Sequence, residues 1–292
     1  MNILVLGVNG LIGSTVFRYL SEYSEHLVFG TVRNQDYINY FNVEFRNNVI
    51  HSVDVNDFDK LVKVFNDTSP GLVINCAGIT KHLRDSESHL VTIPINSVAP
   101  HRLAQICHLT KSRLLHISTD CVFSGKKGNY WEEDFPDAND LYGRSKVLGE
   151  VSYGNNLTIR TSTVGHELMT NFGLLNWFLS QEGSCKGFKN VIFSGLPTVY
   201  LAKIINEYII PSKDLNGLYH VSAEPISKYN LLNLIAERYS KKIKIIPEED
   251  FKIDRSLISD RFRSLTGFKP PSWQELVNIM FEDINKSELK NV

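Results

Sequence analysis

The sequence has no long hydrophobic run, no excess of either charge and few cysteines. No stretch approaches the roughly 18 apolar residues that a membrane-spanning helix needs, so we expect no membrane partner. Its 31 Lys and Arg residues balance 32 Asp and Glu residues, and no positive field would draw the chain to nucleic acid. The amino terminus enters a strand-like segment without the basic region and cleavage site of a signal peptide.

Cysteine and histidine patterns exclude two further classes of site. The 4 cysteines are widely spaced and form no C-x-x-C pair, which is typical of reduced thiols and predicts a cytoplasmic protein. His82 and His89 could share a helix face, but no third ligand lies near them. We therefore predict neither disulfides nor a metal site.

Up to about residue 160, short β-branched runs alternate with longer helical patterns. The predicted strands lie at residues 3–6, 27–32, 49–53, 72–76, 113–117 and 157–159. The predicted helices lie at residues 11–22, 57–66, 84–109 (with breaks at Pro94 and Pro100) and 140–152. Such alternation predicts right-handed crossovers and a doubly wound, parallel Rossmann sheet in an α/β fold.

Beyond about residue 165 this alternation becomes less regular. Helices are predicted at 172–181, 199–209, 228–239 and 273–285, with strands at 191–193, 218–221 and 243–246. We predict an NADP-binding Rossmann domain over residues 1–162. The remainder, 163–292, is predicted to be a smaller, mainly substrate-binding α/β part with some segments returning to the sheet. A ligand should bind in the cleft between them, at the carboxyl ends of the strands.

A glycine-rich loop joins the first strand to the first helix. Gly7 permits a tight turn, Gly10 lets backbone approach a pyrophosphate, and Gly13 lets helix and sheet pack closely. The alternative is a structural turn with no ligand, but the position at a strand–helix junction favours the phosphate loop. The predicted cofactor contacts in this loop are Gly7, Asn9, Gly10, Leu11, Ile12 and Gly13.

The end of the second strand indicates which nicotinamide cofactor binds. An acidic residue about 20 positions after the glycines usually holds the ribose 2′-hydroxyl of NAD. Here Arg33 stands 20 residues after Gly13, with no carboxylate beside it. A guanidinium suits the 2′-phosphate of NADP, so NADPH is predicted; the alternative is a solvated surface arginine.

Two more strand ends carry predicted cofactor contacts. Asp54 can accept a hydrogen bond from the adenine amino group, while the Val55 amide meets a ring nitrogen. Ala77 and Gly78 follow the fourth strand, where small residues let backbone approach the cofactor.

Three residues could perform acid–base chemistry beside this cofactor. Tyr142 and Lys146 are four residues apart, so their side chains lie on one helical face. The Lys146 ammonium and an oxidised nicotinamide would both favour the phenolate form of Tyr142. In the reducing direction Tyr142 would hand a proton to a carbonyl oxygen, and Lys146 would also hold the nicotinamide ribose. Thr119 ends the fifth strand and could polarise the same carbonyl; the alternative is that Ser118, Thr119 and Asp120 cap a turn.

Two segments carry a family resemblance. Both resemble motifs of the dTDP-4-dehydrorhamnose reductases, which are extended short-chain dehydrogenases. Residues 116–125, H-I-S-T-D-C-V-F-S-G, are similar to the family's I-S-T-D-Y-V-F-x-G, and residues 142–150 are similar to its Y-G-x-[ST]-K-x-x-G-E. The resemblance covers nearly the whole chain. It implies NADPH-dependent reduction of the 4-keto group of a dTDP- or UDP-linked 6-deoxy-4-hexulose, supplying a deoxysugar for surface polysaccharide. It also implies Thr119, Tyr142 and Lys146 as the catalytic triad.

The chain departs from that family at two positions that would face the sugar. Cys121 stands where the family usually has Tyr, and Thr163 where it usually has Trp. The pocket should therefore be roomier, and a 2-acetamido sugar on a UDP carrier is a candidate substrate. The predicted substrate contacts are Thr119, Cys121, Tyr142 and Thr163.

Other functions on the same frame stay open. Dehydratases of this type generally carry an Asp-Glu pair after the threonine, where this chain has Asp120-Cys121. Epimerases recycle NAD, against which Arg33 argues. A regulatory subunit that binds cofactor without catalysis is the third possibility, and a homodimer is also left open.

Overall fold

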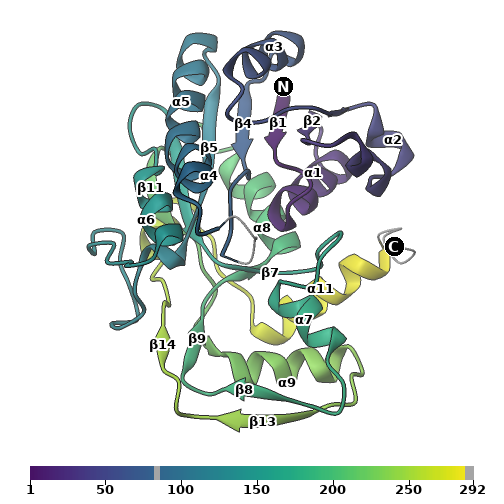
Figure 1. Cartoon of the computed structure of the whole chain (residues 1–292), viewed down its shortest axis with the longest axis vertical. Helices are drawn as coiled ribbons and strands as arrows, with labels where there is room; N and C mark the ends of the chain where they lie inside the picture. The colour runs from purple at the N-terminus through teal and green to yellow at the C-terminus, as the bar shows by residue number, and fades with distance from the viewer. Residues whose placement is uncertain (82–85, 287–292) are drawn as a thin grey trace.

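A computed structural model describes residues 1–81 and 86–286, and its centre is a seven-stranded sheet (Figure 1). The strand order is β11-β6-β5-β4-β1-β2-β3, and every neighbouring pair is parallel. These strands are β1 (Asn2–Leu6), β2 (Leu27–Thr31), β3 (Val49–Ile50), β4 (Leu72–Asn75), β5 (Arg113–Thr119), β6 (Leu157–Thr161) and β11 (Gly217–His220). The predicted doubly wound parallel fold is confirmed.

Helices cover both faces of this sheet because its strands are apolar on both sides. In β1, Ile3 and Val5 join one core cluster while Leu4 and Leu6 join the other, as a period of two requires. The first cluster includes α1 (Leu11–Tyr23), α8 (Thr198–Ile204) and α11 (Trp273–Lys286). The second includes α3 (Phe58–Thr68) and α5 (Ala99–Thr110).

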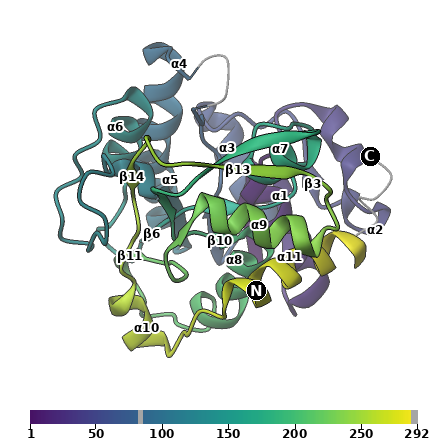
Figure 2. The same ribbon diagram turned by 90° about the horizontal axis from the view of Figure 1, so that it is seen from below.

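The second half of the chain contributes β11 to the sheet and builds a smaller layer beyond its carboxyl edge (Figure 1). Three small sheets form there: β8 (Ser184–Phe188) with β13 (Lys244–Glu248), β9 (Val191–Phe193) between β12 (Ile226–Ser227) and β14 (Ile253–Asp254), and β7 (Thr163–Val164) with β10 (Leu196–Pro197). The helix α9 (Lys228–Arg238) packs along α11 (Figure 2).

The predicted breaks at Pro94 and Pro100 are wrong. Helical backbone continues from α4 (His89–Ile93) through a π-helical segment, η2 (Pro94–Val98), into α5. A proline in a helix lacks an N–H and clashes with the carbonyl four residues before it, and the wider π turn accommodates both effects. The start of that predicted helix, like His82, lies outside the described residues.

Other boundaries also differ from the prediction. The third strand ends at Ile50 rather than at residue 53, and α6 (Leu141–Leu148) ends four residues early. The Asn96 carbonyl oxygen lies so close to Gly149 that a Cβ there would overlap it, and helix α6 stops at this contact. Elements without a predicted counterpart include η1 (Gln35–Tyr40), α2 (Val43–Arg46), β8 and α10 (Asp260–Thr266). In the described ranges, no helix has the length and apolar character needed to cross a membrane.

Candidate active site

A cleft of about 620 Å³ lies at the carboxyl edge of the sheet and is lined by residues from both halves of the chain. Its sheet side carries nine of the predicted cofactor contacts: Gly7, Asn9, Gly10, Leu11, Arg33, Asp54, Val55, Ala77 and Gly78. Ile12 and Gly13 do not line it, since Ile12 packs against the core and Gly13 faces the carbonyl of Gly7.

The glycine loop suits an anion at the amino end of α1. Gly7 has φ +78°, which glycine adopts readily, and its carbonyl accepts a hydrogen bond from the Gly10 amide at 3.1 Å. No side chain caps this helix end, so its first amides are available to a ligand in the cleft. A Cβ on Gly10 would come no closer than 3.5 Å to its nearest neighbour, so the approach is open. These features fit a dinucleotide pyrophosphate.

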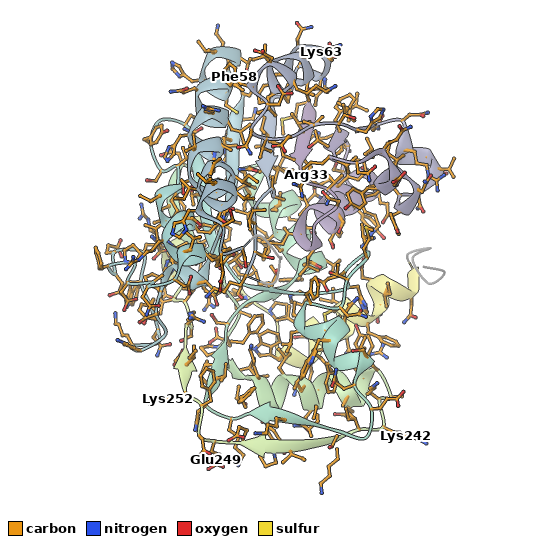
Figure 3. The ribbon with its side chains drawn as sticks, in the orientation of Figure 1. Arg33, Phe58, Lys63, Lys242, Glu249 and Lys252 are labelled. Carbon is orange, nitrogen blue, oxygen red and sulfur yellow. The ribbon has the colours of Figure 1, made fainter. Side chains whose placement is uncertain are left out.

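Arg33 follows β2, is exposed and lines the same cleft. Figure 3 shows it among the side chains of the first half, whereas Lys242 and Lys252 lie at the far end of the second part. Asp54 lies beyond the shortened third strand and accepts a hydrogen bond from the Asn56 amide at 2.8 Å. Arg33 and Asp54 thus place a cation and a carboxylate in the cleft, as we predicted for the adenosine half of the cofactor.

Thr119 and Tyr142 meet beside this cleft. Thr119 ends β5; its hydroxyl accepts a hydrogen bond from the Cys121 amide and donates one to Asp120, each at 3.1 Å. Tyr142 stands in the first turn of α6, and burial raises the pKa of its phenol above the ordinary value of 10, with hydrogen bonding to Thr119 acting in the opposite direction. The net shift is therefore upward, because burial outweighs the shift toward working pH that we expected from the ammonium and an oxidised nicotinamide. The phenol is protonated at neutral pH, as a proton donor must be.

Lys146 lies one helical turn after Tyr142 and is only 5% exposed. Its Nζ donates a hydrogen bond to the Ile117 carbonyl at 2.8 Å. Burial lowers the pKa of this ammonium from 10.5 to about 8, while Glu150 and Cys76 act in the opposite direction. Thr119, Tyr142 and Lys146 are not among the residues that line the cleft, whereas Asp120 and Cys121, which follow Thr119, are.

The start of α6 is held by two contacts that the sequence does not reveal. Asp140 caps the helix by accepting a hydrogen bond from the Gly143 amide at 2.7 Å. The same carboxylate pairs with Lys81 at 2.6 Å, and the Lys81 ammonium lies 5.6 Å from the ring centroid of Tyr142. Lys81 therefore stabilises the end of the helix that carries the phenol.

The second part of the chain supplies two cations that sequence motifs did not single out. Lys228 begins α9 and Arg255 follows β14, and both line the cleft opposite Asp120. Burial lowers the pKa of Lys228, which Asp120 partly opposes. The Arg255 guanidinium donates to the Phe123 carbonyl at 2.8 Å. Of the four predicted substrate contacts, Cys121 and Thr163 line the same cleft, whereas Thr119 and Tyr142 do not.

The described residues hold no group of three or more His, Cys, Asp or Glu side chains that could bind a metal. The cations that line the cleft include Arg33, Lys228 and Arg255, which suit anion binding, and the Thr119 hydroxyl and Tyr142 phenol beside it suit proton transfer.

Comparison with known proteins finds similar sequences and folds. The RmlD substrate binding domain family matches residues 1–286. A probable low-salt glycan biosynthesis reductase of Haloferax volcanii is 35% identical over 151 residues, which cover 51% of this chain and about half (48%) of that protein. A hypothetical dTDP-4-dehydrorhamnose reductase structure from Sulfolobus tokodaii has TM-score 0.74 and 29% identity, covering 94% and 98% of the two chains. A dTDP-4-dehydrorhamnose reductase from Bacillus anthracis, solved in complex with NADP, shares the fold with TM-score 0.78 and 21% identity, covering 97% and 99%.

Proposed function

The chain belongs to the RmlD substrate binding domain family, within the extended short-chain dehydrogenases, and we propose that it is an NADPH-dependent reductase of a nucleotide-linked sugar. Its substrate is the 4-keto group of a dTDP- or UDP-linked 6-deoxy-4-hexulose, and its product a deoxysugar precursor of surface polysaccharide. Residues 1–162 bind the cofactor, and residues 163–292 mainly bind the sugar nucleotide. The observation that carries this proposal is the position of Thr119, Tyr142 and Lys146 beside a cleft that an uncapped helix end and Arg33 also face.

NADPH supplies a hydride to the carbonyl carbon when it is bound. The Gly7–Gly13 loop would hold the pyrophosphate of the cofactor, and Arg33 would hold its 2′-phosphate. Thr119 polarises the substrate carbonyl by a hydrogen bond, and Tyr142 donates its proton to the carbonyl oxygen. Lys146 holds the ribose hydroxyls and returns a proton to Tyr142.

The second part of the chain recognises the nucleotide-sugar. Lys228 and Arg255 provide positive charge on that side of the cleft, which suits the diphosphate of the substrate. Cys121 and Thr163 leave room beside the sugar, and a 2-acetamido group has a carbonyl and an N–H that the Thr163 hydroxyl can meet. Met169 and Phe172 line the same cleft, so part of the free space is already apolar.

The test is the purified protein with NADPH and a panel of dTDP-, UDP- and GDP-linked 4-keto sugars. Oxidation of NADPH, followed by its absorbance, should require both a 4-keto sugar nucleotide and Tyr142. Tyr142→Phe serves as the matched control, because it keeps the ring and removes only the transferable proton. A protein that binds NADPH but reduces none of these sugars would favour the regulatory subunit. Interconversion of a 4-hydroxy sugar with added NAD would favour an epimerase.

A further inference from the structure

A buried row of polar side chains connects the end of β4 to Lys146. Asn75 ends β4, His116 lies on β5 and Lys146 on α6, and their exposed fractions are 2%, 0% and 5%. Asn75 Nδ2 lies 3.1 Å from His116 Nδ1, and His116 Nε2 lies 3.4 Å from Lys146 Nζ. Because all three are removed from water, the direction of each hydrogen bond matters energetically.

The Ala77 amide determines the direction of the hydrogen bonds along this row. This backbone N–H can only donate, and it donates to Asn75 Oδ1 at 3.1 Å. The other end of the Asn75 amide, the Nδ2 donor, therefore faces His116 Nδ1, which must accept. A neutral imidazole carries one proton, so that proton lies on Nε2. Burial and the neighbouring Lys146 lower the pKa of His116 well below its ordinary value, so the ring is neutral.

The Nε2–H of His116 consequently faces the nitrogen of Lys146. An ammonium offers only donors, so two donors oppose each other, whereas a neutral amine has a lone pair that accepts. We propose that Asn75 and His116 are positioning residues that hold an N–H donor against Lys146 and favour its neutral amine. The inference rests on the proposed function in taking Lys146 as a proton-transfer group.

Other groups around Lys146 act independently of this pair. The Ile117 carbonyl, on β5, accepts a hydrogen bond from Lys146 in either of its protonation states. Cys76 follows β4, and burial raises the pKa of its thiol to about 12, so this thiol is neutral. Glu150, which follows the end of α6, favours the ammonium, and its carboxylate is already paired with Arg160 at 2.8 Å. His116 is thus a side chain whose hydrogen-bond direction adds to burial in disfavouring the ammonium of Lys146.

A lysine with this partner can exchange its proton near working pH. A proton-transfer group is most effective when its pKa lies near the pH at which it operates. Lys146 can then return a proton to Tyr142 after the phenol has protonated a substrate. Without the opposing donor, Lys146 would remain an ammonium at higher pH and release its proton less readily.

The ring proton of His116 can be located directly by NMR. Long-range ¹H–¹⁵N correlation spectra of the full-length protein distinguish protonated from unprotonated imidazole nitrogens, and loss of the signal in His116→Gln assigns it. We expect the proton on Nε2 in the wild-type protein and on Nδ1 in Asn75→Asp, whose carboxylate accepts from both neighbours. A wild-type proton on Nδ1 would overturn the proposal. If His116→Gln does not fold, His116→Asn or variants of the other eight histidines identify the signal by elimination.

The effect on Lys146 is measured by ¹³C NMR of lysine Cε through a pH titration, assigned with Lys146→Met. Asn75→Asp should raise the pKa of Lys146 by roughly one pH unit. The added carboxylate also contributes by charge, so the same substitution is made in His116→Leu as a matched control. The rise should be clearly smaller there, and equal rises would refute the role of the imidazole. These measurements use neither substrate nor cofactor, so their outcome is independent of whether the reductase assay succeeds.

Discussion

The glycine loop allows a test that separates packing from cofactor binding, because two of its glycines have opposite surroundings. A Cβ on Gly13 would overlap the Gly7 carbonyl oxygen, lie 2.9 Å from its carbonyl carbon and 3.2 Å from the Cys76 Cβ. A Cβ on Gly10 would meet only the Gly7 carbonyl oxygen, at an ordinary 3.5 Å. Gly10 also has φ −85° and ψ 164°, which alanine adopts without strain. Gly13→Ala should therefore damage the fold, and Gly10→Ala the binding of the cofactor.

The expected magnitudes follow from these contacts. Forcing a methyl group into packed backbone costs typically about 1–3 kcal/mol. Alanine regains up to about 1 kcal/mol of helix propensity at Gly13, which lies inside α1. A net loss of roughly 1–2 kcal/mol should lower Tm by about 2–8 °C. For Gly10→Ala, the added methyl group would push the pyrophosphate away from the loop; if one charged hydrogen bond is lost in this way, about 1.5–3 kcal/mol, NADPH binding weakens roughly 10- to 150-fold.

Two assays on the same preparations decide the outcome. Thermal unfolding without cofactor gives Tm, and titration calorimetry with NADPH gives Kd for each variant that remains folded. Gly10→Ala should unfold near the wild-type temperature and bind NADPH weakly. The reasoning fails if Gly13→Ala is as stable as the wild-type protein, or if Gly10→Ala binds NADPH normally.

Four further outcomes are expected. Arg33→Ala should weaken NADPH binding by about 1.5–3 kcal/mol and leave NADH binding nearly unchanged; equal affinity of the wild-type protein for both cofactors in calorimetry would contradict this. Tyr142→Phe should lower kcat ~10²–10⁴-fold with NADPH affinity intact, and normal turnover would mean that another group supplies the proton. Because burial lowers the pKa of Lys146 to about 8, its ammonium is lost as pH rises through that value, and kcat/KM should fall there rather than stay level. A 2-acetamido 4-keto sugar nucleotide should exceed its 2-hydroxy counterpart by at least roughly 10-fold in kcat/KM, since Cys121 and Thr163 leave room for the larger group; equal values would refute this.

The sheet and the cofactor loop could be predicted because their signals are local. Strand runs alternate with helical patterns along the chain, and this alternation allows few topologies. The i, i+4 spacing of Tyr142 and Lys146 places both on one face of any helix that forms there. Their approach to Thr119 follows as well, since the carboxyl ends of parallel strands gather at one edge of the sheet.

Features that depend on distant segments were missed or mispredicted. Pro94 and Pro100 predicted breaks, but a π turn buried against α6 continues the helix. Lys228 and Arg255 carry no motif, and they reach the cleft only because α9 and β14 fold back toward Asp120. No sequence pattern predicts that these two residues approach the cleft, since their position depends on how whole elements pack together.

The protonation states of Tyr142 and Lys146 depend on tertiary structure for the same reason. The sequence alone identified the phenol and the ammonium, and it predicted that one would lower the pKa of the other. Burial instead raises the pKa of Tyr142 and lowers that of Lys146, because both charged forms lose contact with water. Residue types and spacing thus determine which groups are available, whereas the depth of burial and the direction of hydrogen bonds determine which proton each group holds. Both of those arise only when β4, β5 and α6 pack around His116.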